Sequence, residues 1–187
     1  MLFHYESEKL NYDIYAPENA DRILDFYYAN KAVFEPYEPD HPDSFYTPDY
    51  QTTLAKLEYE NFLRTKSARY WISLKDRPEN LIGCVSFNNI VRGSFMNCTI
   101  GYKIHKCYQK MGYATEAVNF LCTKAFEELG LHRIEAYIEP SNTSSIALAQ
   151  KCGFEYDGIA KEYVYMKGQW RDHLRFTRIA PGSIHHP

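Results

Sequence analysis

The stretch from 99 to 138 constrains the fold most, because it combines two strands and one helix in a fixed order. Thr99–Ile104 alternates as a strand does, and Ile134–Ile138 shows the same period of two. Between them, Thr115–Leu129 carries its apolar residues on one helical stripe and is closed by Gly130. Strands joined through a helix run parallel in one sheet. The sequence therefore predicts a parallel strand pair crossed by a helix.

The other connections are too short for such crossovers and predict antiparallel pairs. A turn at Asp76–Asn80 separates two strands, and a turn near Arg92–Gly93 leads to the next. Two helices precede these strands, and a short helix and a hairpin follow the parallel unit. The further elements expected are strands at Asn11–Tyr15, 69–74, Leu81–Ile90, Glu155–Val164 and Trp170–Ile179, and helices at 20–30, from Pro48 onward, and at Ser144–Lys151. The result is an α/β fold, a mixed, mostly antiparallel sheet of about seven strands flanked by helices.

A length of 187 residues fits a single domain, 1–187, with its core at about 12–179. The hydrophobic fraction of 45% indicates a folded protein with a substantial core. A net charge of −3 gives no basic footprint for nucleic acid. The tail from Ala180 to Pro187 is expected outside the sheet.

The cysteines are odd in number and lack metal-ligand spacing. None of the five forms a Cys-x-x-Cys pair, and His105 with Cys107 has no second ligand pair nearby. We therefore expect reduced, mostly buried thiols and no metal site. The first residues lack the features of a signal peptide, and no apolar run has membrane-spanning length. These observations predict a soluble, cytoplasmic protein without membrane partners.

One motif lies where the strand Thr99–Ile104 gives way to the long helix, in the run CYQKMGYATEAVNF. Free amides at a helix start, together with the positive end of its dipole, form an anion site. Gly112 permits a close backbone approach or an unusual dihedral angle. On its own the motif is equally compatible with an ordinary loop that contains a glycine.

A second motif favours the anion site. EPSNTSSIALAQKCGF follows the next strand, and the two motifs together resemble those of the GCN5-related N-acetyltransferase (GNAT) superfamily. The runs LHRIEAYI, FEPYEP and YMKGQWRDH are similar to those of its ribosomal-protein alanine and serine N-acetyltransferases. The resemblance covers the chain from about Tyr12 to Ile179, although a shared fold does not fix the substrate.

The resemblance implies acetyl-CoA as cosubstrate, bound between splayed central strands. Backbone groups of Tyr102, Lys103 and Ile104 would pair with the pantetheine arm, and Asn142 would hydrogen-bond it. In this family a Q/R-x-x-G-x-G/A loop binds the pyrophosphate. Here that loop consists of Gln109, Lys110, Met111, Gly112, Tyr113 and Ala114.

The chain departs from the wider family at one catalytic position. Many members carry a tyrosine seven residues after the asparagine, as acid for the leaving thiolate, but Ala149 stands there. Ser145, three residues after Asn142, is the candidate that faces the sulfur, because a hydroxyl can donate to a developing thiolate. The alternative is that Ser144 and Ser145 are ordinary helix-start residues.

Several carboxylates remain open as the general base. Glu35, Glu38, Glu135 and Glu162 are candidates, as is a water held by several of them; the alternative for Glu135 is a pair with Arg133 or a lysine. Family members shape the acceptor site with a proline-rich loop, here Glu35–Asp49, so Glu35, Tyr37 and Glu38 are the expected substrate-binding residues. The same loop is acidic and would attract a cationic acceptor, or it is a solvated surface. His173 and His132 are expected to have structural roles.

The chemistry of the amine favours a protein N-terminus as acceptor. An α-amino group with a pKa of about 7.7–8.0 is partly neutral near pH 7, whereas a lysine amine at about 10.4 is not. The expected activity is acetyl transfer to a protein α-amine, such as that of a ribosomal protein. The alternatives are a polyamine or aminoglycoside acceptor, and a non-catalytic acyl-CoA-binding regulatory module. A homodimer is compatible with the family, whose members often pair through their C-terminal strands.

Overall fold

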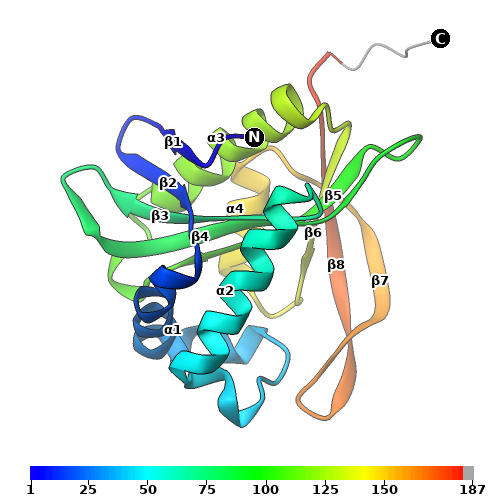
Figure 1. Cartoon of the computed structure of the whole chain (residues 1–187). Helices are drawn as coiled ribbons and strands as arrows, with labels where there is room; N and C mark the ends of the chain where they lie inside the picture. Colours follow the sequence, from blue (N-terminus) through cyan, green and yellow to red (C-terminus); the bar gives the residue numbers. More distant parts are fainter. Residues whose placement is uncertain (183–187) are drawn as a thin grey trace.

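The computed structural model describes residues 1–182, whose strands form a single sheet with the order β1-β2-β3-β4-β5-β6-β8-β7 (Figure 1). The strands are β1 (His4–Glu6), β2 (Leu10–Ile14), β3 (Ala68–Leu74), β4 (Arg77–Val91), β5 (Asn97–Ile104), β6 (Arg133–Ile138), β7 (Glu155–Met166) and β8 (Gln169–Ile179). The helices are α1 (Ala20–Phe34), α2 (Pro48–Leu63), α3 (Tyr113–Leu129) and α4 (Thr143–Lys151). The expected α/β architecture is confirmed, with one strand more than the sequence predicted.

Two details of the antiparallel half differ from the sequence prediction. The additional strand β1 has only three residues, too few to show a period of two. The expected turn Asp76–Asn80 is wrong, because β4 already begins at Arg77 and the turn comprises only Lys75 and Asp76. A register irregularity after Ile72 lets the polar stretch at the start of β4 pair with the end of β3.

The parallel pair is confirmed, but it is short. β5 and β6 are in register only at Asn97–Thr99 with Arg133–Glu135. Beyond these residues β5 continues to Ile104 against β4, and β6 continues to Ile138 against β8. The two inner edges therefore separate, and their backbone groups become available to a ligand that adds like a strand. The expected splay of the central strands is thus present.

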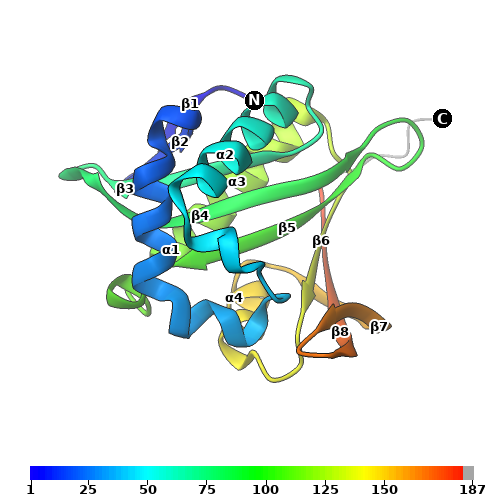
Figure 2. The same ribbon diagram turned by 60° about the horizontal axis from the view of Figure 1, so that its bottom comes forward.

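Helices cover both faces of the sheet (Figures 1 and 2). Tyr70 and Ile72 pack in the core beneath α3 and α4, whereas Trp71 points to the opposite face. That face holds the second core, built with residues of α1 and α2 such as Phe26 and Ala55. Because side chains alternate along a strand, one short run serves both cores.

Turns and helix ends follow the local sequence. Gly130 ends α3 in the left-handed conformation, with φ of 63°. Lys167 and Gly168 form the β7–β8 turn, both with positive φ, as a tight hairpin requires. β8 ends at Ile179, so Ala180–Gly182 lie beyond the sheet as expected, and the remainder of the tail, 183–187, lies outside the described residues.

Four cysteines are buried as free thiols, and Cys107 is the exposed one. Within residues 1–182 no cluster of three or more histidine, cysteine or acidic side chains is arranged to hold a metal ion. None of the helices in this part of the chain is both long and apolar enough to cross a membrane.

Candidate active site

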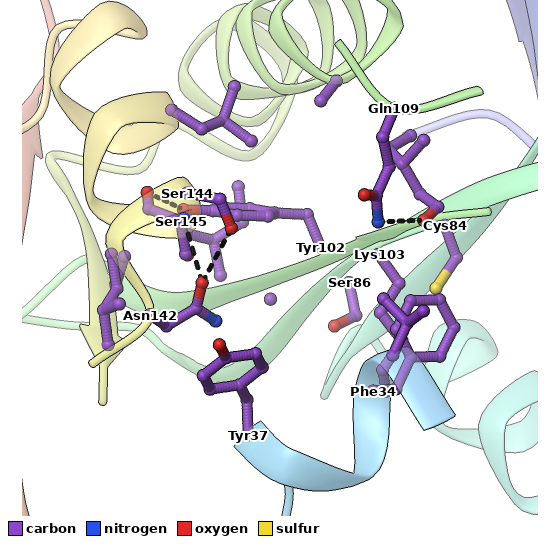
Figure 3. Close-up of a pocket in the computed structure, with 18 of the residues that line it drawn as sticks. Phe34, Tyr37, Cys84, Ser86, Tyr102, Lys103, Gln109, Asn142, Ser144 and Ser145 are labelled. Atoms are coloured by element: carbon purple, nitrogen blue, oxygen red, sulfur yellow. Dashed lines mark hydrogen bonds between the residues drawn. The ribbon is translucent and has the colours of Figure 1, made fainter. Parts of the chain in front are cut away.

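A cavity of about 680 Å³ lies where β5 and β6 separate. Its walls come from the split strands, the loop after α1, the segment before α3 and the start of α4. Figure 3 shows Gln109 on one side, Asn142, Ser144 and Ser145 on the other, and Tyr37 reaching in from the loop after α1. The split in the sheet therefore brings together segments that are distant in sequence.

The end of the cavity beside α3 has the geometry of an anion site. Gly112 lies at the N-cap of α3 with φ of 89°, a left-handed conformation that glycine adopts without strain. The amides of the first helical turn have no partner within the helix and point outward at its positive end. Gln109, Lys110, Gly112 and Ala114 line the cavity. Of the two expected loop residues that do not, Met111 has an exposed side chain, while Tyr113 begins α3 and faces a neighbouring hollow.

The side chain of Gln109 fixes this loop to the end of β5. Its Nε2 donates to the carbonyl oxygen of Ile104 at 3.2 Å (Figure 3). One of the backbone acceptors expected to pair with a ligand is therefore engaged within the chain. Tyr102, Lys103 and Ile104 all line the cavity along the separated edge of β5.

Asn142 and Ser145 form a bridge between α4 and β5. Asn142 caps α4, and its Oδ1 accepts from the Ser145 amide at 3.1 Å and from Ser144 Oγ at 3.0 Å. Ser145 Oγ donates to the Tyr102 hydroxyl at 2.9 Å, and that hydroxyl donates to the Ser145 carbonyl at 3.1 Å. Burial raises the pKa of Tyr102 to about 12, so it is a hydrogen-bonding phenol near neutral pH. The hydroxyl of Ser145 is thus oriented within the cavity wall.

The opposite wall contains a mostly buried ion pair that the sequence did not reveal. Lys103 Nζ lies 2.6 Å from Glu38 Oε1, and the two side chains are 23% and 13% exposed. His41 Nε2 lies 2.8 Å from the other oxygen of Glu38. Burial opposes ionisation of Glu38, but Lys103 and then His41 outweigh it and lower the pKa of the carboxyl. Glu38 is therefore a carboxylate with two partners.

Folding also neutralises much of the acidic loop. Besides Glu38 with Lys103, Glu35 pairs with Lys31 at 3.7 Å and Asp40 pairs with Lys167 at 2.7 Å. The acidic character expected from the sequence took into account only the charges of the loop itself, and not cations from other segments. The cations come from α1, β5 and the β7–β8 turn.

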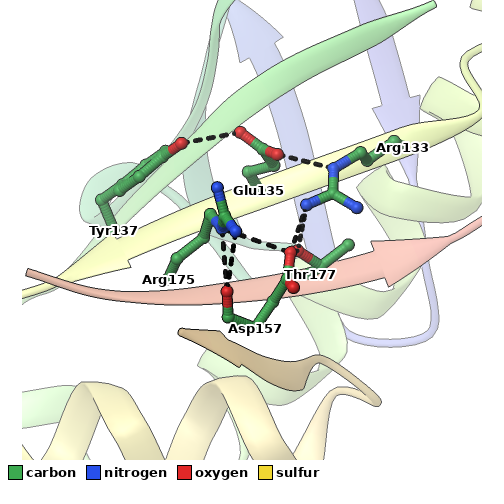
Figure 4. Close-up of polar contacts among 6 residues, drawn as sticks. All are labelled: Arg133, Glu135, Tyr137, Asp157, Arg175 and Thr177. Atoms are coloured by element: carbon green, nitrogen blue, oxygen red, sulfur yellow. Dashed lines mark hydrogen bonds and ion pairs between the residues drawn. The ribbon is translucent and has the colours of Figure 1, made fainter. Parts of the chain in front are cut away.

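The structure does not bring the other candidate bases to the cavity. Glu35 instead accepts from the Tyr46 hydroxyl at 3.1 Å. Glu162 is exposed on β7, and its amide donates to Asp172. Glu135 is held by Arg133 Nε at 2.6 Å and by the Tyr137 hydroxyl at 2.9 Å (Figure 4).

Further residues line the cavity that the sequence did not assign to the site. Arg69 donates to the Tyr27 hydroxyl at 2.6 Å and pairs with Glu58 beneath the cavity. Tyr137 and His173 enter from β6 and β8. β6 pairs with β8, so both strands lie on the side of the split opposite β5.

Comparison with known proteins identifies the class to which this fold and site belong. Residues 14–155 match the family model described as the acetyltransferase (GNAT) domain. The [ribosomal protein uS5]-alanine N-acetyltransferase of Escherichia coli (strain K12) is 34% identical over 164 residues, covering 87% of this chain and 84% of the relative. The chain belongs to the GNAT acetyltransferase family, and the resemblance seen in the sequence is confirmed.

Solved structures agree with this assignment. The ribosomal-protein-S5-alanine acetyltransferase of Vibrio fischeri superposes with a TM-score of 0.88 at 28% identity, over 96% of this chain and 97% of that one. RimJ of Mycobacterium smegmatis, solved in complex with CoA-disulfide, has a TM-score of 0.84 at 24% identity, over 91% of this chain and 82% of that one. The second likeness supports the fold alone.

Proposed function

We propose that the chain transfers an acetyl group from acetyl-CoA to the α-amine of a protein N-terminus, with a ribosomal protein as the leading acceptor. The observation that carries the proposal is the split in the sheet. An anion-binding helix start lies at one end of its cavity, and an aromatic and carboxylate-bearing loop lies at the other. The relative named for uS5 alanine acetylation supports the choice of acceptor.

The residues of the cavity fit acetyl-CoA. A volume of about 680 Å³ lies within the range of small-molecule sites. The helix start at Gly112, with Lys110 and Lys151 also in the lining, suits a pyrophosphate. The unpaired edge of β5 suits an extended arm that bonds like a strand. When bound, the cosubstrate supplies an activated thioester.

Residues of α4 and β5 would act on the leaving sulfur. In this proposal the Ser145 hydroxyl, which donates to Tyr102 in this structure, rotates to donate a hydrogen bond to the developing thiolate, and Asn142 holds the coenzyme arm. A thiol with a pKa of about 8.5 leaves readily, so a hydrogen bond is sufficient and the missing tyrosine is not required.

The acceptor side would be formed by Tyr37 and Glu38, which line the cavity opposite α4. Neither Glu35 nor Glu162 reaches the lining of the cavity. In this proposal either of them could act on the acceptor amine only through water molecules. An α-amine needs less help from a base than a lysine amine does, because more of it is already neutral. A peptide N-terminus therefore suits a pocket whose carboxylate is already paired.

A small amine is the second candidate, because a relative that is 26% identical over 117 residues is named spermidine N(1)-acetyltransferase. Asp40 in the loop after α1 accepts from the amide and the ammonium of Lys167, at 3.0 and 2.7 Å. This contact joins the loop after α1 to the β7–β8 turn and helps to hold in place the loop that carries Tyr37 and Glu38.

The same contact gives a testable prediction. Replacing Lys167 by alanine should leave stability nearly unchanged, because exposed ion pairs contribute little. It should raise the KM for the acceptor about threefold and leave the KM for acetyl-CoA unchanged, because a freed hairpin orders less of the loop that carries Tyr37 and Glu38. Steady-state kinetics with each substrate varied would measure this. Lys161→Ala is the matched control, an exposed lysine of the same hairpin without an ion pair among the described residues; equal effects of the two variants would argue against the contact.

The acceptor is identified by release of free thiol from acetyl-CoA. One panel would contain peptides that begin with alanine, serine or methionine, each also prepared with its α-amine blocked. The other would contain polyamines and aminoglycosides. Turnover with unblocked peptides only supports the proposal, whereas turnover with small amines only replaces it by the second candidate. Tight coenzyme binding without turnover on either panel would favour a regulatory module.

A further inference from the structure

His173 is a buried histidine that lines the cavity and has one ring nitrogen without a hydrogen-bond partner among the described residues. It lies on β8, is 6% exposed and contributes to the lining. Its Nδ1 lies 3.3 Å from the carbonyl oxygen of Arg171. A carbonyl can only accept, so Nδ1 carries the hydrogen and Nε2 of the neutral ring is left with a lone pair. Nε2 has no hydrogen-bond partner within residues 1–182.

The two carboxylates that line the cavity already have hydrogen-bond or ion-pair partners. Glu38 is paired with Lys103 and His41. Glu139 accepts from the amide of Ser141 at 2.7 Å and also from its hydroxyl. Because both carboxylates already have partners, neither is well placed to accept a proton from the acceptor amine.

Three further groups of the lining have raised pKa values, which makes them poor proton carriers near neutral pH. Burial raises the pKa of the Cys84 thiol. Burial is also the main cause that raises the pKa values of Tyr102 and Tyr137 to about 12. The imidazole nitrogen of His173 that has no hydrogen-bond partner among the described residues is therefore the better candidate to accept a proton.

Aromatic rings surround His173, and no carboxylate pairs with it among the described residues. Tyr163 of β7 faces the ring at 5.9 Å between centroids, and Tyr137 of β6 stacks on Tyr163 at 4.2 Å. Arg175, two residues along β8, is directed to the carbonyl of Asp157 at 2.8 and 3.0 Å. The charged pair across the cavity is Lys103 with Glu38, which compensate one another. No carboxylate contacts the imidazole among the described residues.

We propose that His173 is the general base that takes the proton from the attacking amine, an inference that rests on the proposed function. As the nitrogen of the neutral amine forms its bond to the acetyl carbon, Nε2 accepts one proton from that nitrogen. The carbon–sulfur bond breaks, and its electron pair leaves with the sulfur. The imidazolium then returns a proton through water, and the thiolate takes one up to give the free thiol. Amide and thiol are the only products.

The variant His173→Gln tests this role. It should bind coenzyme A as the wild type does and lose about 10–100-fold in kcat. On the acid side, the plot of log(kcat/KM) against pH should be less steep for the variant than for the wild type, because one proton-accepting group has been removed. Exogenous imidazole should restore part of the rate to His173→Ala. His132→Gln is the matched control, because His132 is exposed and lies outside the lining.

A second measurement does not depend on turnover. Nitrogen-15 NMR of histidine-labelled protein with coenzyme A bound should show His173 as the Nδ1–H tautomer. A peptide acceptor should shift its Nε2 resonance. Finding the Nε2–H tautomer would overturn the inference, and so would an unchanged rate and slope in His173→Gln while the wild type acetylates peptides. A wild type that acetylates no peptide would overturn the proposed function itself, and the inference with it.

Discussion

Replacing Gly112 by alanine is expected to weaken coenzyme A binding by about 10–100-fold. The φ of 89° places this residue where a side chain costs about 1–2 kcal/mol, so the loop relaxes away from its present geometry. Such a shift misdirects the amides at the start of α3, and each lost hydrogen bond to a charged group costs about 1.5–3 kcal/mol. Apart from its chain neighbours, no atom of residues 1–182 lies within 4 Å of the added Cβ, so the effect arises from backbone geometry and ligand approach. Isothermal titration calorimetry with coenzyme A measures it.

Gly93 provides the matched control for this prediction. It has φ of 71°, its Cβ would also meet nothing within 4 Å, and it lies in the β4–β5 turn outside the cavity lining. Gly93→Ala should therefore cost similar stability and leave coenzyme affinity unchanged. Equal affinities of the two variants would show that the start of α3 does not bind the coenzyme.

Replacing Lys103 by methionine should have the largest effect on stability, about 3 kcal/mol. It leaves the Glu38 carboxylate mostly buried without its main partner, and breaking a buried pair in this way is costly. The loop after α1 would then lose its anchor on β5, so acceptor binding should weaken as well. Urea unfolding followed by circular dichroism gives the free energy.

The double variant Lys103→Met/Glu38→Gln separates an unpaired charge from lost packing. Removing both charges should recover a clear part of the loss, because much of the single-variant penalty is the stranded carboxylate. A double variant no more stable than Lys103→Met alone would show that Lys103 acts through its contacts with the rings of Tyr27 and Phe34.

Local sequence patterns predicted the architecture of the fold and most of its elements. The crossover between Thr99–Ile104 and Ile134–Ile138 predicted the parallel pair, and Gly130 predicted the end of α3. The errors were at positions where tertiary pairing overrides local pattern. Strand β1 is held by β2, and the start of β4 is held by an irregular register with β3.

The sequence predicted the part of the site that one continuous segment forms, but not the parts that distant segments form together. The run Gln109–Ala114 begins a helix, so its anion-binding geometry could be expected from spacing. The pair of Glu38 and Lys103 and the position of His173 depend on segments that meet only in the folded protein. No periodicity or motif links residue 38 to residue 103. The candidate base Glu162 was suggested by its strand, but it is exposed outside the lining.

The most direct test of the account is to locate the acetyl group on an acceptor. The protein would be incubated with isotope-labelled acetyl-CoA and a peptide that begins with alanine and contains one internal lysine. Tandem mass spectrometry would then show which nitrogen carries the label. The account predicts the label on the α-amine and none on the lysine. A label on the lysine, or none on the peptide while spermidine becomes labelled, would contradict it.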